Sequence, residues 1–300
     1  MNRERGQAEA GVSTRPAIVA VFNPASGSSS GLDTAALQEA LGAEVEVVET
    51  SPDDPGHGQT RDAIDGGARC VVACGGDGTV RAVMEELAGS QVELGVIPLG
   101  TGNLLAANLE LDEGLDNARC AVSGTARRID TVLLNGERFA VMAGVGFDAL
   151  MIRDANSATK RRFGSIAYVF SAARHVPARL FGATVTIDGE AVWHGRSAMV
   201  LMGNFGTVSG GLTVFPDARP DDGCVDIAVL AARSVREWAS VVTRLLLRRS
   251  QRDQLVHRFS GAEVEVTLDR AVAYEIDGED RPPTTALQAS VDPRSLRVRC

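Results

Sequence analysis

The chain contains almost no lysine. Its 300 residues include 30 lysines and arginines, and Lys160 is the one lysine among them. The sequence therefore lacks a Gly-Lys-Ser/Thr phosphate-binding loop, and elsewhere it has no lysine that could form a Schiff base. The formal net charge of −9 argues against a general affinity for nucleic acid, so we expect no nucleic-acid partner.

Cysteine and long apolar runs are also scarce. The five cysteines are an odd number, and no two of them form a Cys-x-x-Cys pair. This usage is typical of a reduced chain, so we expect a cytoplasmic protein. No stretch approaches the roughly 18 consecutive apolar residues of a membrane-spanning helix. Residues 1–15 are polar, and we expect them to form a mobile tail without a targeting signal.

Short apolar runs alternate with helical patterns in the first part of the chain. The runs at 17–23, 44–49, 69–74 and 94–98 predict strands, each followed by a turn marked by Gly or Pro and by an Ala/Leu-rich segment. The first and third runs are apolar on both faces, as are strands covered by helices on both sides. We therefore predict a doubly wound α/β domain with a parallel sheet at residues 16–130.

The pattern changes after Arg127 to a series of strand-like runs with turn residues between most of them. Such a series predicts an antiparallel β-sandwich or barrel, which we place at residues 131–300. Two helical patterns, at about 163–175 and 234–250, interrupt it. The runs are RRIDTVLLN (127–135), RFAVMAGV (138–145), ATVTIDG (183–189), SAMVLMGN (197–204), VDIAVLAA (225–232), AEVEVTLD (262–269), AVAYEIDGE (271–279) and LRVR (296–299).

A glycine-rich turn, CGGDGTV at 74–80, lies between a predicted strand and a predicted helix. Its glycines bring backbone N–H groups close to an anion, and the following helix N-terminus adds its dipole, so the turn fits a phosphate. Asp77 would repel that phosphate unless a cation or a proton-donating hydroxyl lies between them. The alternative is a tight turn in which Asp77 caps the helix.

Two further loops follow predicted strands at the carboxyl edge of the parallel sheet, where such sheets bind ligands. They are FNPASGSSSG at 22–31 and PLGTGN at 98–103. Their small and hydroxyl side chains can surround phosphates. Each loop alone is also typical of an ordinary connection, but three such loops at one sheet edge favour a phosphate site.

Residues 27–31 also match the G-x-S-x-G nucleophile elbow of hydrolases. Asp226 and His257 could complete a catalytic triad in the required order. The elbow normally follows several strands, whereas this one follows the first, and no His-Gly-Gly segment precedes it. The pattern therefore argues against a hydrolase.

Two acidic segments in the second half are candidate sites. FPDARPDDGCVD at 215–226 could bind a hard cation through Asp222 and nearby carbonyls, or could be a solvated turn. EIDGED at 275–280 places Asp277 and Glu279 astride a glycine. An Asp-Gly hairpin with an exposed acid would give the same pattern.

These segments together carry a family likeness. NPASG (23–27), GGDGT (75–79), PLGTGN (98–103), PDARPDDG (216–223) and DGE (277–279) resemble, in this order, the diacylglycerol kinase catalytic-domain family, which includes bacterial soluble lipid kinases and sphingosine kinases. GGDGT is shared with NAD kinases, whereas the other segments are typical of the lipid-kinase branch. The resemblance covers roughly residues 17–300. It implies a nucleotide-binding α/β domain, a C-terminal β-sandwich domain, and a cleft between them where ATP and Mg²⁺ meet a lipid hydroxyl.

The resemblance also implies roles for individual residues. Glu279 matches the family's proton acceptor, and Asp77 matches a residue assigned to metal handling or, in the sphingosine branch, to base catalysis. A structural Mg²⁺ would be held by the Asp222 carboxylate and the main-chain carbonyls of Arg219 and Cys224. The nucleotide would be surrounded by Asn23, Ser26, Thr50, Gly75, Gly76, Asp77, Gly78, Thr79, Thr101 and Asn103.

The chain departs from the family pattern near the cleft. The family commonly has Asn-Glu where this chain has Arg81 and Ala82, and it often has Asp where this chain has Leu104. An acid of the cleft would then be missing, or be supplied by Glu85 or Glu86. The departure concerns the lipid side of the site more than the nucleotide side.

We therefore expect an ATP-dependent lipid kinase that phosphorylates a hydroxyl of diacylglycerol or a related lipid. A NAD-kinase-like phosphotransferase and a nucleotide- or lipid-binding module without turnover are the alternatives. Residues 152–180 and 233–252 each carry six basic residues and one acidic residue. Either segment could dock on an anionic membrane at the inner face, or its arginines could be solvated over apolar positions that pack on the sandwich. The oligomeric state is left open.

Overall fold

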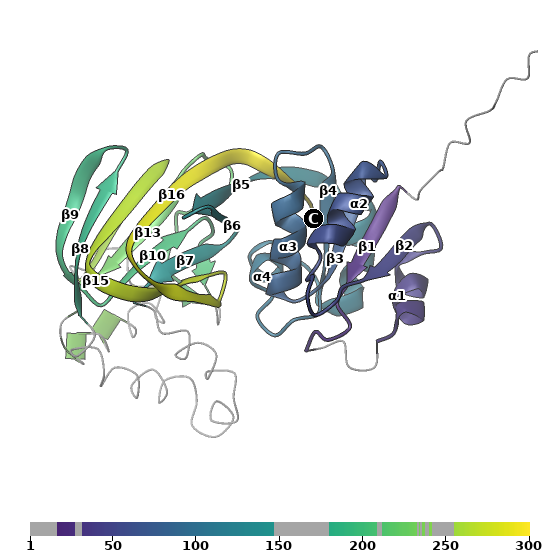
Figure 1. The fold of residues 1–300 in the computed structure, drawn as a ribbon, viewed down its shortest axis with the longest axis horizontal. Helices are drawn as coiled ribbons and strands as arrows, with labels where there is room; N and C mark the ends of the chain where they lie inside the picture. Colours follow the sequence, from purple (N-terminus) through teal and green to yellow (C-terminus); the bar gives the residue numbers. More distant parts are fainter. Residues whose placement is uncertain are drawn as a thin grey trace, which may run out of the picture.

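The computed structural model describes two lobes that follow each other along the chain (Figure 1). It describes residues 17–27, 32–146, 180–208, 212–232 and 255–300, together with 234, 236, 237, 240 and 241. The predicted helix at 163–175 lies outside these residues, and so does most of the one at 234–250.

The first lobe is built on a parallel sheet with the strand order β4-β3-β1-β2. This confirms the predicted α/β domain. The strand β3 is buried along its whole length because helices cover both faces of the sheet. The strands are β1 (Ile18–Phe22), β2 (Val45–Glu49), β3 (Cys70–Gly75) and β4 (Glu93–Pro98).

Helices of this lobe divide between the two faces of the sheet. Apolar residues of α2, α3 and α4 share one core with one face of the strands, and those of α1 and α5 share another core with the opposite face. The helices are α1 (Thr34–Leu41), α2 (His57–Asp65), α3 (Asp77–Leu87), α4 (Leu104–Asn108) and α5 (Ala118–Ser123), with a short 3-10 turn η1 (Gly114–Asn117).

The second lobe consists of antiparallel strands, which confirms the predicted β-sandwich. Its core is formed by alternating residues of these strands, such as Val264 and Val266 of β15. The strands are β5 (Ala126–Leu134), β6 (Glu137–Phe139), β7 (Met142–Val145), β8 (Phe181–Ile187), β9 (Glu190–Ser197), β10 (Met199–Gly203), β11 (Thr207–Val208), β12 (Leu212–Thr213), β13 (Val225–Leu230), β14 (Val256–Gly261), β15 (Glu263–Ile276) and β16 (Glu279–Arg299).

The long strand β16 joins the two lobes. It pairs with β15 in the second lobe, runs along β5, and ends beside β4 of the first lobe, where Val298 is the parallel partner of Leu94. The yellow arch in Figure 1 shows this course. Leu296 and Val298 are fully buried in a core that also contains residues of α3 and α4. The last residues of the chain therefore belong to the packing of the first lobe.

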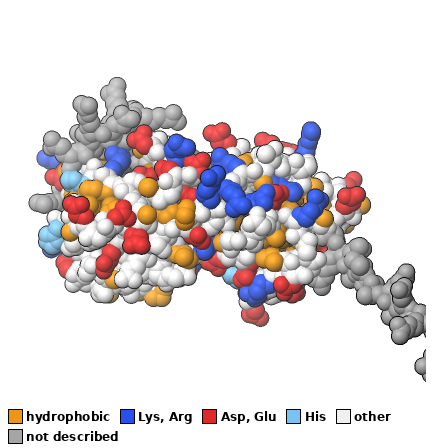
Figure 2. Space-filling view, turned by 90° about the horizontal axis from the view of Figure 1, so that it is seen from above, with side chains coloured by type: hydrophobic (Ala, Val, Ile, Leu, Met, Phe, Trp, Pro, Cys, Tyr) orange, Lys and Arg blue, Asp and Glu red, His pale blue; other side chains and the backbone are white. Residues whose placement is uncertain are grey.

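The surface and the helices add two further observations. Acidic and basic side chains are interspersed over both lobes on the face shown in Figure 2. None of the helices in the described ranges has the length and apolar character that crossing a bilayer would require.

Candidate active site

Three glycine-rich and hydroxyl-rich loops meet at the carboxyl edge of the parallel sheet. The amide of Gly76 donates a hydrogen bond to Ser26 Oγ at 2.9 Å, which links the loops after β3 and β1. A Cβ on Gly100 would lie 2.5 Å from the Cα of Gly76, so the loops after β4 and β3 touch through their backbones. No side chain fits between them. The predicted convergence of the loops is therefore present in the structure.

Polar contacts fix the shape of these loops. Asn23 Nδ2 donates to Thr79 Oγ1 at 3.1 Å. Asn103 has a left-handed backbone, and its side chain both accepts from the Gly100 amide at 2.8 Å and donates to the Gly100 carbonyl at 2.9 Å. A Cβ on Gly27 would lie 3.2 Å from Thr101 Oγ1. The predicted nucleotide residues of the three loops thus lie together.

Thr50 and Gly75 lie at the same edge of the sheet. Thr50 follows β2, and its amide donates to the Phe22 carbonyl at 2.8 Å, which places it beside the end of β1. Gly75 ends β3, where a Cβ would lie 2.7 Å from Thr79. Both positions fit a pocket that follows the carboxyl ends of the strands.

The N-terminus of α3 lies at this edge of the sheet. Its N-cap residue is Gly76, which has no side chain to bind the first backbone N–H groups, and the Asp77 carboxylate contacts the amide of its own residue. Backbone N–H groups at such a position, together with the helix dipole, favour a phosphate. The turn at 75–79 therefore has the backbone geometry that the sequence predicts for a phosphate site.

Asp77 lies in the first turn of α3, and its carboxylate binds the backbone of the next loop. Its Oδ1 accepts from the Leu104 amide at 2.6 Å, and its Oδ2 accepts from the Asn103 amide at 2.9 Å. Burial raises the pKa of Asp77, and the negative charge of Glu279 raises it further. The hydrogen bonds from the backbone amides lower the pKa, but they do not cancel the effect of burial. The carboxylate thus ties α3 to the start of α4.

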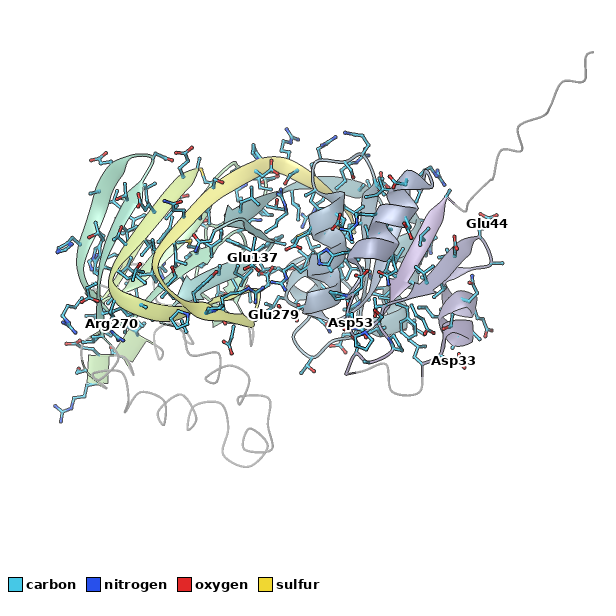
Figure 3. All side chains as sticks on the ribbon, viewed as in Figure 1. Asp33, Glu44, Asp53, Glu137, Arg270 and Glu279 are labelled. Carbon is cyan, nitrogen blue, oxygen red and sulfur yellow. The ribbon has the colours of Figure 1, made fainter. Side chains whose placement is uncertain are left out.

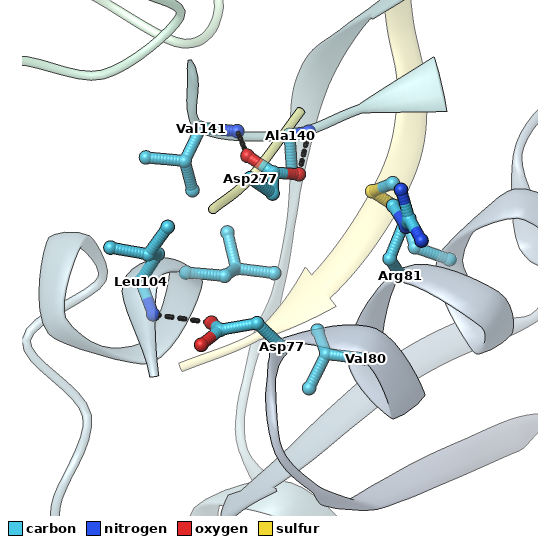
Figure 4. Close-up of a pocket in the computed structure, with 9 residues that line it drawn as sticks. Asp77, Val80, Arg81, Leu104, Ala140, Val141 and Asp277 are labelled. Atoms are coloured by element: carbon cyan, nitrogen blue, oxygen red, sulfur yellow. Dashed lines mark hydrogen bonds between the residues drawn. The ribbon is translucent and has the colours of Figure 1, made fainter. Parts of the chain in front are cut away.

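Asp277 faces this region from the second lobe. It forms a two-residue hairpin turn with Gly278 between β15 and β16, with φ of 45° and 84°. Its buried carboxylate accepts from the amides of Ala140, Val141 and Met142 at 2.9 to 3.2 Å. Burial raises its pKa to about 6, and the Asp77 charge adds to the shift. Figure 4 shows Asp77 and Asp277 on opposite walls of one pocket.

This pocket between the lobes is narrow, with room for about one water molecule. Asp77 and Arg81 line it from α3, Leu104 from α4, and Val141 and Asp277 from the second lobe. Side chains from both lobes therefore close around the two acids.

Glu279 lies beside the pocket, against the first turn of α3. A Cβ on Gly78 would be 2.9 Å from Glu279 Oε1. Its Oε2 accepts from Arg81 and, at 3.4 Å, from Arg281. Figure 3 shows Glu279 and Glu137 in the region between the sandwich and α3. The two predicted catalytic acids, one from each lobe, therefore lie at the same helix turn.

Glu85 and Glu86 do not supply an acid to the cleft, so that expectation was wrong. Glu86 Oε1 contacts His57 Nδ1 at 3.0 Å and accepts from Arg61 at 2.9 Å, and Glu85 lies 3.7 Å from His57 Nε2. Both glutamates face α2 because His57 and Arg61 lie on that helix.

Glu137 and Arg281 are neighbours of the site that no sequence pattern predicted. Arg281 Nε donates to both carboxylate oxygens of Glu137, at 3.0 and 2.8 Å. Neither residue lies in a recognisable motif. The one local signal was the spacing of two between Glu279 and Arg281 on a strand, which places both side chains on one face.

The acidic turn before β13 has the chemistry of a cation site. Asp222 Oδ1 accepts from the Cys224 amide at 3.0 Å, and buried Asp130 accepts from the Gly223 amide at 2.7 Å. Burial raises the pKa of Asp226 to about 6, and the charges of Asp222 and Asp217 add to this. Within the described residues, no three His, Cys, Asp or Glu side chains are grouped to hold a metal ion. A site with one carboxylate and the Arg219 and Cys224 carbonyls stays a prediction.

Two other sequence features, the hydrolase pattern that the sequence already argued against and the basic segments, gain little from the structure. His257 packs against Trp193 in the second lobe, with ring centroids 6.1 Å apart, whereas Gly27 contacts Thr101 in the first lobe. The hydrolase triad therefore has no support. The basic segments at 152–180 and 233–252 lie almost wholly outside the described residues, although Val241 is buried in a small core with Leu230 and Ala232.

Comparison with known families gives two adjacent matches that together cover nearly the whole chain. Residues 17–134 match the diacylglycerol kinase catalytic domain. Residues 141–300 match the YegS C-terminal NAD kinase beta sandwich-like domain. The matches meet where β5 and β6 lie, close to the change of pattern seen in the sequence.

Two relatives match most of their own length. A protein of Pseudomonas aeruginosa named probable lipid kinase YegS-like is 30% identical over 88% of this chain and 87% of its own. The diacylglycerol kinase of Bacillus subtilis is 29% identical over 70% of each chain.

Solved structures share the fold. A putative diacylglycerol kinase from Bacillus anthracis superimposes with a TM-score of 0.75 at 19% identity, over 94% of this chain and 96% of that one. An NAD kinase from Archaeoglobus fulgidus in complex with ATP gives a TM-score of 0.53 at 14% identity, over 94% of this chain and 93% of that one. The fold is thus more similar to the first of these two structures.

Proposed function

The chain belongs to the lipid kinase family in which a diacylglycerol kinase catalytic domain precedes a YegS-type C-terminal domain, and we propose that it transfers the γ-phosphate of ATP to a lipid hydroxyl. Membership makes it a phosphotransferase. One observation carries the rest of the proposal: Asp77 and Glu279, from different lobes, lie at the helix turn where the phosphate-binding loops converge.

The loops of the first lobe suit the triphosphate of the donor. Backbone contact between Gly76 and Gly100 leaves the turns without side chains that would obstruct phosphate oxygens. The N-terminus of α3, which directly follows β3, lies at the same edge of the sheet. Phosphoryl transfer depends mainly on positioning and on charge stabilisation, and this backbone supplies the positioning.

The residues present also fit a magnesium ion, the usual partner of a kinase nucleotide. Asp77 offers carboxylate oxygens, which hard cations prefer. The carboxyl groups of Asp277 and Glu279 lie close enough to interact electrostatically with Asp77, and they add negative charge to the site. Asp77 would hold the ion, which when bound would neutralise charge on the phosphate oxygens. Asp222, with the Arg219 and Cys224 carbonyls, would hold a second, structural ion.

Glu279 is the proposed proton acceptor. Its Oε1 faces the first turn of α3 and accepts no hydrogen bond from the described residues, whereas Oε2 is bound by arginines. A carboxylate with one free oxygen beside the phosphate site can take the proton of an attacking hydroxyl. Asp77 is more enclosed, and each of its oxygens accepts one backbone amide and keeps one lone pair for a cation, which fits a role in charge handling.

The proposed acceptor is diacylglycerol or a related lipid, by analogy with the Bacillus subtilis relative. A lipid acceptor requires contact with a membrane surface, so we propose peripheral binding at the inner face through residues 152–180 or 233–252. Vesicle sedimentation tests this: binding should rise with anionic lipid and fall with salt. Sedimentation that is independent of both would exclude such docking.

Two alternatives keep specific support. The fold is shared with an NAD kinase, although the TM-score is lower than for the diacylglycerol kinase structure. A binding module without turnover is suggested by Arg81 and Leu104, which replace residues common in the family. However, Leu104 donates a hydrogen bond to Asp77 through its backbone amide, and any residue except proline could donate the same bond.

One experiment separates these possibilities. The purified protein is incubated with γ-labelled ATP, Mg²⁺ and a mixed lipid extract, in parallel with Asp77→Asn and with Asp112→Asn, an exposed loop residue, as control. A labelled lipid should form with the wild type and the control and be lost in Asp77→Asn. Labelled NADP⁺ from added NAD⁺, or ATP binding without transfer, would each contradict the proposal.

A further inference from the structure

Four charged side chains form a network between the lobes. Arg81 comes from α3, Glu137 from β6, and Glu279 and Arg281 from β16. Arg281 contacts both glutamates, and Arg81 Nη1 lies 3.9 Å from Glu137 Oε2. The two positive and two negative charges balance.

Within this network, Arg81 makes the close contact with Glu279. Arg281 Nε donates to both carboxylate oxygens of Glu137, at 2.8 and 3.0 Å. The contacts of Arg281 Nη1 and Nη2 with Glu279 Oε2 are longer, at 3.4 Å. Arg81 Nη2 binds Glu279 Oε2 directly. Arg81 is also the member of the network that lies on the first lobe, so it fixes Glu279 relative to the phosphate loops.

The contact orients the carboxylate of Glu279. Because Arg81 and Arg281 both bind Oε2, the other oxygen is turned toward Gly78 in the first turn of α3. This is the oxygen that can accept a proton beside the phosphate site. Arg81 makes this contact through Nη2 alone, and its Nη1 is buried without a hydrogen-bond partner among the described residues. An asparagine in the same place is too short to reach Oε2 and carries no positive charge.

Stability alone gives no strong reason for the pair. Glu279 is 43% exposed and Arg81 is 16% exposed. Ion pairs that remain this accessible to solvent stabilise a fold only slightly. A comparable pair in the second lobe, Arg138 with Asp292, is 15% and 38% exposed and lies outside the site, so it provides a matched control.

We propose that Arg81 is a positioning residue, which holds the Glu279 carboxylate with its free oxygen toward the acceptor hydroxyl. This rests on the proposed lipid kinase function and extends it. Because Arg81 lies on α3 and Glu279 on β16, the orientation of the proposed proton acceptor depends on a contact between the lobes.

The test compares Arg81→Asn, Arg81→Lys and the control Arg138→Asn in the labelled-lipid assay with ATP and Mg²⁺. Arg81→Asn should lower kcat at least about tenfold and leave KM for ATP within about twofold, because the phosphate loops are untouched. Arg81→Lys should restore part of kcat, since it keeps the positive charge near Glu279 but has a differently shaped donor group. Arg138→Asn should keep the wild-type kcat. Thermal melting of each variant checks that it folds.

A double-mutant comparison separates positioning from a general structural effect. In a Glu279→Gln background, Arg81→Asn should cause no further loss, because the group that it positions is gone. An unchanged kcat in Arg81→Asn, or an equal tenfold loss in both backgrounds, would overturn the role of Arg81 alone. If the wild type labels no lipid, the proposed function itself fails, and the role of Arg81 fails with it.

Discussion

At the scale of single residues, Glu275 is a buried acid that the proposed chemistry does not use. It is 2% exposed on β15, and its Oε1 has no hydrogen-bond partner in the part of the chain that the structure describes. Burial raises its pKa to about 8, and the charges of Asp280 and Asp277 add to the shift. Folding therefore favours the protonated form of this side chain.

This shift predicts how stability depends on pH. Below about pH 4.5 Glu275 is protonated in both states, whereas between about 4.5 and 8 the unfolded chain loses the proton first, so the free energy of unfolding falls as the pH rises. The loss is a few kcal/mol at about 1.4 kcal/mol per pKa unit. Glu275→Gln should remove most of this slope in urea unfolding between pH 6.5 and 8, above the raised pKa of about 6 of Asp226 and Asp277, which contribute to the slope at lower pH. The exposed Glu265→Gln should keep it, and an unchanged slope in Glu275→Gln would refute the assignment.

Motif residues and their partners differ in how well the sequence predicts them. Asp77 and Glu279 could be named from the sequence because each directly follows a glycine in a short motif, GGDGT and DGE. Arg81 was noticed as a departure, but its contact with Glu279 joins positions 198 residues apart. Such a pairing depends on how the two lobes pack, and no local pattern encodes it.

At the scale of elements, the site depends on the backbone contact between the turns after β3 and β4. A Cβ on Gly100 would lie 2.5 Å from Gly76 Cα and 2.8 Å from Asn103 Oδ1. Gly100→Ala should therefore push the turns apart and weaken ATP binding at least about tenfold, or ~1.4 kcal/mol. Calorimetric titration of ATP measures this.

A second glycine provides the comparison for that variant. A Cβ on Gly27 would meet the end of one side chain, Thr101 Oγ1, at 3.2 Å, so Gly27→Ala should have a smaller effect on the Kd. Equal affinities for wild type and Gly100→Ala would show that the turns do not form the nucleotide site.

Strands of the first lobe were predicted closely, and those of the second less so. β1 to β4 are short apolar runs with marked turns. In contrast, β9 and β14 were missed because polar residues dominate them, as in EAVWHGRS. The predicted run at 138–145 is divided into β6 and β7. The amides of residues 140–142 donate hydrogen bonds to the Asp277 carboxylate, and strand pairing is interrupted there. The run at 262–269 and most of the run at 271–279 form one strand, β15, whose pairing with β16 shifts register between Thr267 and Tyr274. Residues 277–279 form the turn and the start of β16.

At the scale of the whole molecule, the two lobes share one core. Leu296 near the end of β16 is fully buried with residues of α3, β5 and the second lobe. Leu296→Ala should cost about 3 kcal/mol, as is usual for a buried leucine. The loss should appear equally in far-UV circular dichroism and in the fluorescence of Trp193 and Trp238, which both lie in the second half of the chain. An unchanged fluorescence transition would show that the lobes unfold separately.

The shared core also explains why the site could be predicted only in part. The three loops of the first lobe follow from strand order and glycine pattern. The approach of Glu279 to α3 depends on β16, which crosses from one lobe to the other over 21 residues. Sequence periodicity gives no information on that crossing.

The most direct measurement is the rate of phosphate transfer in a single turnover by Glu279→Gln, with ATP, Mg²⁺ and diacylglycerol vesicles. If acids from both lobes act on one phosphoryl group, the variant should bind ATP as the wild type does and transfer phosphate at least about a hundredfold more slowly, the usual effect of losing a positioned base. Transfer at the wild-type rate by a folded, metal-replete variant would contradict a catalytic site shared between the lobes.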